Sequence, residues 1–147
     1  MEPDSRPVLV GEANPYGADP KYALFPMPMN SAGGRLCFKV LGMEMRDYLA
    51  AFDRVNLCPQ AWSKYQASEH AVKLACQKRP LVLLGSKVCS AFGTPYTPFE
   101  SRDLVLVLPH PSGLCRAWNV EGSYERARDS VKGLLPSVAH LLGRRDP

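Results

Sequence analysis

The fold of this chain is decided by the stretch LVLVLPHPSGL, residues 104–114. Five consecutive apolar residues followed by a proline are typical of a buried β-strand, which we place at 104–108. His110 comes next, and the prolines on either side of it leave its backbone little freedom. Because ligands bind at the carboxyl ends of strands in open α/β sheets, His110 is a candidate site residue.

Outward from this strand, apolar strands alternate with helical segments. The pattern predicts further strands at residues 7–11, 54–57 and 81–84, and helices at 31–41, 46–52, 63–78, 86–92 and 123–142. Ser31 and Ser86 are predicted N-caps, Gly42 a helix stop, and Pro136 a kink in the last helix. Continuous apolar strands separated by helices predict a three-layer α/β/α sandwich around a four-stranded parallel sheet, in one domain of residues 1–147.

The composition is that of a globular protein, with 46% apolar and 22% charged residues in a chain of 147. No apolar run approaches the roughly 20 residues that cross a bilayer, so we expect no membrane partner. The charged, proline-bearing N-terminus does not resemble a secretory signal, and we expect a cytoplasmic monomer. The net charge of +4 is weakly in favour of a polyanionic partner.

The cysteines predict neither a disulfide framework nor a metal site. There are five, an odd number, and no two of them form a C-x-x-C pair. We therefore expect reduced and mostly buried thiols, and no bound metal. The positions are Cys37, Cys58, Cys76, Cys89 and Cys115.

Polar residues follow several predicted strands and meet at one sheet edge. Glu12, Asn14 and Tyr16 follow the first strand, Asn56 ends the second, and His110 follows the fourth. Each has a purely structural alternative, as a turn residue, a loop cap or a hydrogen-bonded rim histidine. Together they suit a heterocyclic base: Asn56 offers a donor and an acceptor, His110 can donate to an oxygen that gains charge, and Tyr16 can form a wall. Glu12 or Asn14 can place a water.

Motifs of other enzyme classes are absent from the sequence. There is no G-x-x-x-x-G-K-[ST] loop, no G-x-S-x-G elbow and no G-x-G-x-x-G dinucleotide fingerprint. These absences disfavour a P-loop nucleotidase, an α/β-hydrolase and a dinucleotide-dependent enzyme.

With these residues in view, the chain resembles the uracil-DNA glycosylase superfamily. The segment GEANPYG at 11–17 resembles its first motif and HPSGL at 110–114 its second. Three further segments resemble its iron–sulfur-bearing branch: SAGGRL at 31–36, VNLCP at 55–59 and LLGSK at 83–87. The resemblance covers about residues 7–120, and the two motifs occur in the expected order.

The resemblance implies strand order 2-1-3-4 and hydrolysis of an N-glycosidic bond in DNA, with the base flipped out of the stack. His110 would stabilise the leaving base as an anion, and Asn56 would read it. Asn14 falls where members carry a water-positioning residue, and Glu12, at the branch's motif-one glutamate, is its rival. The motifs place no lysine for a Schiff base, so the implied reaction is monofunctional and needs no cofactor.

The same resemblance implies the contacts with DNA, double- or single-stranded. Leu114 would be the wedge that fills the gap left in the duplex. Ser112, Arg116 and Lys87 would contact phosphates, and Gly113 belongs to the same DNA-contacting loop.

Two departures from the iron–sulfur branch matter. The N-terminal cysteine pair is missing, and Cys58 and Cys76, which resemble the other two ligands, cannot hold a cluster by themselves. The aromatic that stacks on the base is also undecided between Phe25 and the neighbourhood of Met29. With Phe25, uracil or another deaminated base is expected. A deformable methionine-lined pocket instead predicts a bulkier modified pyrimidine of phage DNA, and hence a defence enzyme.

Two other function classes remain open on the sequence alone. One is a non-catalytic nucleic-acid-binding module on the same fold, and the other is a nucleosidase that acts on free nucleosides. The basic charge and the sequence Leu114-Cys115-Arg116 favour a polymeric substrate over a free nucleoside.

Overall fold

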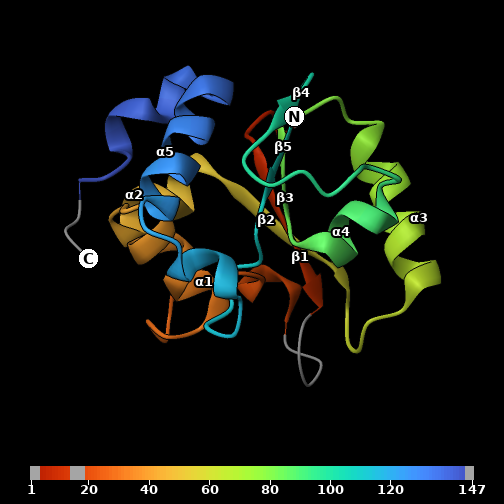
Figure 1. Cartoon of the computed structure of the whole chain (residues 1–147). Helices are drawn as coiled ribbons and strands as arrows, with labels where there is room; N and C mark the ends of the chain where they lie inside the picture. Colours follow the sequence, from red (N-terminus) through yellow and green to blue (C-terminus); the bar gives the residue numbers. More distant parts are fainter. Residues whose placement is uncertain (1–3, 14–18, 145–147) are drawn as a thin grey trace.

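The computed structural model describes residues 4–13 and 19–144 of the chain (Figure 1). It is an α/β structure built on one five-stranded sheet with strand order β2-β1-β3-β5-β4. β4 is antiparallel to β5, and the other neighbouring strands are parallel. The strands are β1 Val8–Ala13, β2 Asp53–Cys58, β3 Leu81–Leu84, β4 Ser101–Arg102 and β5 Val105–Leu108.

Helices cover both faces of this sheet, with α1, α2 and α5 on one side and α3 and α4 on the other (Figure 1). None of the helices in the described part of the chain combines the length and apolarity that a membrane span requires. The α-helices are α1 Ala32–Gly34, α2 Met45–Ala51, α3 Lys64–Ala75, α4 Ser86–Ala91 and α5 Ser123–Leu134. A π-helix, Arg35–Val40, continues α1, and 3-10 turns occupy Pro20–Tyr22, Arg116–Asn119 and Pro136–Leu141.

The core forms two layers, one on each face of the sheet. Leu9, Val82 and Leu106 pack with residues of α2, α5 and the π-helix, whereas Val10 and Leu83 pack against α3 and α4. Successive side chains of a strand point to opposite faces, so a strand covered on both faces needs apolar residues at every position. This is why β3 and β5 are continuous apolar runs, whereas β2 (DRVNLC) is buried only at its last two residues. The predicted three layers are present.

The prediction of a four-stranded, all-parallel sheet is wrong in one respect. The four predicted strands are adjacent, in the order β2-β1-β3-β5, but β4 adds a fifth, antiparallel strand at the edge. β4 has only two residues, both exposed, and it pairs Ser101 with Leu106 and Arg102 with Val105. β4 exists as a strand because β5 lies beside it. A segment of two residues is too short to show a periodic pattern, so no sequence signal marks it.

The helix boundaries are partly as predicted. Ser31 is the N-cap of α1, where its hydroxyl accepts a hydrogen bond from the Gly34 N–H, and Gly42 ends the segment with φ of +60°. Ser86 is not the cap of α4; Gly85 precedes the helix and Ser86 is its first residue. The last predicted helix is interrupted, as expected, before Pro136.

Candidate active site

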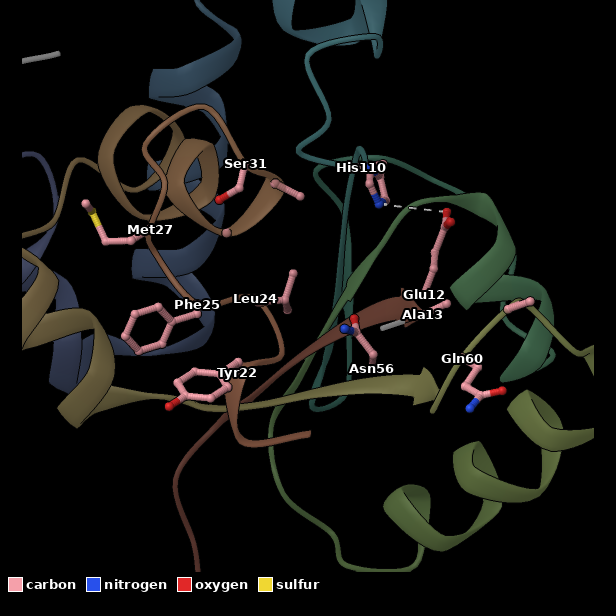
Figure 2. Close-up of a pocket in the computed structure, with 13 residues that line it drawn as sticks. Glu12, Ala13, Tyr22, Leu24, Phe25, Met27, Ser31, Asn56, Gln60 and His110 are labelled. Carbon is pink, nitrogen blue, oxygen red and sulfur yellow. Dashed lines mark ion pairs between the residues drawn. The ribbon is translucent and has the colours of Figure 1, made fainter. Parts of the chain in front are cut away.

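A cavity of about 830 Å³ opens at the carboxyl end of the parallel strands (Figure 2). Glu12 and Ala13 from the end of β1, Asn56 from β2 and His110 from the segment after β5 line one side. The loop after residue 19 and the start of α1 line the other side. The location is the one that an open α/β sheet offers to a ligand.

The imidazole of His110 is held in one orientation by backbone groups. The ring Nδ1 accepts a hydrogen bond from the Ser112 N–H at 3.1 Å. The backbone carbonyl of His110 accepts a second hydrogen bond, from Trp118 Nε1 at 2.8 Å, which fixes the backbone that carries the ring. A backbone N–H can only donate, so Nδ1 carries a lone pair and the proton of the neutral ring is on Nε2. That Nε2 lies 3.9 Å from Glu12 Oε1 at the cavity wall (Figure 2).

Burial keeps this histidine neutral. Removal from water lowers the pKa of His110 below its ordinary value of 6.5, and Lys87 lowers it further, while the nearby carboxylate of Glu12 opposes the shift. Protonation of Nδ1 would also break the hydrogen bond from Ser112. The ring therefore presents a neutral Nε2–H donor to the cavity at neutral pH.

Two glycines make room for the polar side chains. Gly85 has φ of +96°, and a Cβ there would lie 3.2 Å from His110 Cβ. Gly11 lies opposite Asn56 in the β1–β2 register, and a Cβ on it would clash with Asn56 Oδ1. The absence of these two side chains lets His110 and the Asn56 amide occupy the edge of the sheet.

The opposite wall of the cavity is aromatic. Figure 2 shows Tyr22 and Phe25 across the cavity from His110 and Glu12. The Tyr22 ring meets Phe25 edge to face with centroids 5.4 Å apart. The Arg54 guanidinium lies 5.9 Å from the Phe25 centroid. These contacts fix the Phe25 ring in the cavity wall.

Of the two stacking candidates, only Phe25 lines the cavity. Met29 is exposed and is not part of the described lining, whereas Met27 is. Gly33 explains the path of this loop, because a Cβ on it would clash with the backbone of residues 24 and 25. The loop is thereby packed directly against the start of α1.

The predicted DNA-contacting residues lie outside the cavity. Leu114 is 92% exposed at the tip of a turn in which its N–H donates to Ser112 Oγ at 3.1 Å. Arg116 is exposed in the following 3-10 turn, and Gly113 is exposed beside Arg35. Lys87 is exposed on α4, with its Nζ 5.9 Å from the Trp62 ring centroid.

The structure thus brings Glu12, Phe25, Asn56 and His110 to one cavity. Asn14 and Tyr16 lie outside the described residues. The sequence reasoning missed several further lining residues: Tyr22, Leu24, Met27, Ser31, Gln60 and Ala61. Gln60 and Ala61 follow the end of β2 and could have been found by the same strand-end argument. The others depend on the path of a long loop, which no periodicity encodes.

The two cysteines that resemble cluster ligands are far apart. Cys58 is buried before α3, where its Sγ accepts a hydrogen bond from the Ser63 N–H at 3.2 Å, and Cys76 is exposed at the far end of that helix. Twelve helical residues separate the ends of α3 by about 18 Å. Cys58 and Cys76 therefore cannot ligate one cluster together.

Comparison of the chain with models of protein families, with curated proteins and with solved structures gives no match.

Proposed function

We propose that this protein is a monofunctional DNA glycosylase that hydrolyses the N-glycosidic bond of a flipped-out base and leaves an abasic site. The observation that carries the proposal is the His110 ring, whose Nδ1 is occupied by the Ser112 N–H and whose Nε2 meets the cavity beside Glu12. A fixed neutral donor of this kind is suited to a base oxygen that gains negative charge as a bond breaks. The sequence resemblance to uracil-DNA glycosylases supports the same reaction, and the order of the four parallel strands is the one that this resemblance implies.

The reaction uses the residues of the cavity in two roles. As the bond between C1′ and the base nitrogen breaks, its electron pair leaves with the base, and His110 Nε2–H donates to the base oxygen where charge collects. A water adds its oxygen to C1′ and loses a proton, which the Glu12 carboxylate can accept. Asn14 is the alternative group for orienting that water, proposed from the sequence.

Recognition of the base falls to the opposite ends of the cavity. The Asn56 amide offers a donor and an acceptor to a base edge that carries a carbonyl beside an N–H. Phe25 supplies the stacking face, a contact worth about 1–3 kcal/mol per base. Tyr16 is a further proposed wall residue. Leu114, which is 92% exposed in the turn after His110, is proposed to fill the gap in the duplex. Ser112, Gly113, Arg116 and Lys87 are proposed to contact the DNA backbone.

The alternative substrate is a bulkier modified pyrimidine, as found in phage DNA, in which case the protein acts in defence. The presence of Met27 in the cavity wall favours this alternative, because a thioether can deform around a substituent. Phe25 in the same wall favours uracil or another deaminated base.

One assay tests the proposal and separates these substrates. Oligonucleotides that carry uracil, hypoxanthine or modified cytosines, single-stranded and duplex, are incubated with the protein, and abasic sites are then cleaved with alkali. We expect strand cleavage on one substrate class, lost in His110→Ala and retained in the matched control His140→Ala, whose side chain is exposed in the Pro136–Leu141 turn. No abasic sites on any substrate, with binding retained, would identify a non-catalytic module instead.

A further inference from the structure

Arg35 joins the two walls of the cavity. Its backbone N–H donates to the Ser31 carbonyl at 2.8 Å, at the start of α1, and its Nε donates to the Pro111 carbonyl at 3.2 Å. Ser31 lines the cavity, and Pro111 directly follows His110. One half-buried arginine thus connects segments 76 residues apart in the chain.

The acceptor of Arg35 belongs to the same peptide group that holds the histidine. The carbonyl of Pro111 and the N–H of Ser112 are the two ends of one peptide unit. Arg35 Nε–H donates to the oxygen of this peptide unit, the Pro111 carbonyl. The N–H of the same unit, that of Ser112, donates to His110 Nδ1 at 3.1 Å. A charged donor on the oxygen polarises the amide and strengthens the N–H as a donor, because hydrogen bonds in series reinforce each other.

We propose that Arg35 is a positioning residue, which acts through the Pro111–Ser112 peptide to hold His110 in its neutral, Nε2-protonated form. Its catalytic consequence rests on the proposed glycosylase function, but its effect on the imidazole does not. The geometry of the loop supports this role, since a Cβ on Gly113 would lie 3.7 Å from Arg35 Cζ and Nη1. The guanidinium therefore lies against the loop on both sides of Ser112.

Two charged groups of the described residues act on His110 directly: Glu12 on β1 favours the imidazolium, and Lys87 on α4 disfavours it. We expect Arg35, in the π-helix, to oppose the imidazolium through its hydrogen bond to the Pro111 carbonyl. Without Arg35, the carboxylate of Glu12 should stabilise the imidazolium form of His110 more effectively. The pKa of His110 then rises toward its ordinary value, and the proton of the neutral ring is no longer confined to Nε2.

The test is ¹⁵N NMR of the histidine rings in the full chain, free of DNA, across pH. Arg35→Met keeps the length and packing of the side chain but removes the charge and the donor, Arg35→Lys keeps the charge, and Arg102→Met, exposed on β4, is the matched control. The His110 signals are those that vanish in His110→Ala. We expect a wild-type ring with a protonated Nε2 and an unprotonated Nδ1.

In Arg35→Met we expect mixed tautomers and a raised His110 pKa, partly restored in Arg35→Lys and unchanged in Arg102→Met. If a DNA substrate is found, kcat should fall about tenfold in Arg35→Met with little change in KM, since only the orientation of a donor is lost. An unchanged His110 tautomer and titration in folded Arg35→Met and Arg35→Lys would overturn the proposal. Failure of the glycosylase function would leave the NMR result standing, so the two failures are distinguishable.

Discussion

At one end of the parallel strands charged side chains pair with one another, whereas at the other end titratable side chains line a cavity. At the amino end, Arg79 Nη2 pairs with Asp53 at 3.0 Å and with Asp4 at 3.4 Å, and Arg6 pairs with Asp4 at 2.8 Å. At the carboxyl end, His110 and Glu12 are 3.9 Å apart, and burial keeps the histidine neutral. The first cluster consists of charges that satisfy one another. In the second, a backbone N–H holds the His110 ring, and both His110 and Glu12 line a cavity.

The pKa values follow the same division. The side-chain hydrogen bond from Arg6 holds the pKa of Asp4 well below its usual range, so this carboxylate is charged and paired at every physiological pH. His110 is shifted by burial first and by charge second. A group stabilised in its charged form by partners supports the fold, whereas a group held neutral near a cavity remains available for a ligand.

The largest expected effect is at the carboxyl end. Substitution His110→Ala should lower the single-turnover rate on the preferred oligonucleotide by about 100- to 1,000-fold, the usual cost of one preorganised donor. The free energy of unfolding should also fall, by about 1–2 kcal/mol, because the side chain is only 27% exposed and the variant leaves the Ser112 N–H without its acceptor. The rate is measured by abasic-site formation, and the stability of the variant is measured by thermal unfolding. A rate within threefold of that of His140→Ala would contradict the assignment.

Next in size is Gly85→Ala, which introduces a Cβ 3.2 Å from His110 Cβ. Its φ of +96° also makes alanine strained, by about 1–2 kcal/mol. Gly93→Ala is the matched control, because Gly93 has φ of +64° but nothing within 4 Å of a new Cβ. Both variants should unfold at a lower temperature than the wild type. Only Gly85→Ala should show a lower single-turnover rate, by about tenfold. Equal rates in the two variants would mean that His110 tolerates displacement.

A smaller effect, on stability alone, is expected at the amino end. Arg79→Met removes the contacts to Asp53 and Asp4 and a hydrogen bond to the Arg6 carbonyl at 2.9 Å, and the Arg79 side chain is only 9% exposed. We expect a loss of about 1–2 kcal/mol in the free energy of unfolding, measured in urea, with an unchanged rate per folded molecule. A lower rate in this variant would show that the two ends are coupled.

Much of the scaffold could be predicted from the sequence because its signals are local. The apolar run of β3, the Ser31 cap and the Gly42 stop each depend on a few neighbouring residues. β4 could not be predicted, since its two exposed residues pair only because β5 lies beside them. The π-helix after α1 likewise has no sequence signal that distinguishes it from an α-helix.

The candidate site divides in the same way. His110, Glu12 and Asn56 follow from strand ends, whose convergence at one edge is a rule of parallel sheets. Other features of the site depend on how the loops cross that edge. These are the presence of Phe25 and Met27, but not Met29, in the cavity wall, and the hydrogen bond from Arg35 to the Pro111 carbonyl. Such paths are set by long-range packing, as at Gly33, and not by the local pattern.

The most direct test of the account is the pH dependence of the single-turnover rate of base release. A neutral His110 is the active donor, and its pKa lies below 6.5, so the rate should be level from neutral pH down to that value and fall at more acidic pH. A rate that instead rises as the pH falls through 6.5 would identify the imidazolium as the active form and contradict the account.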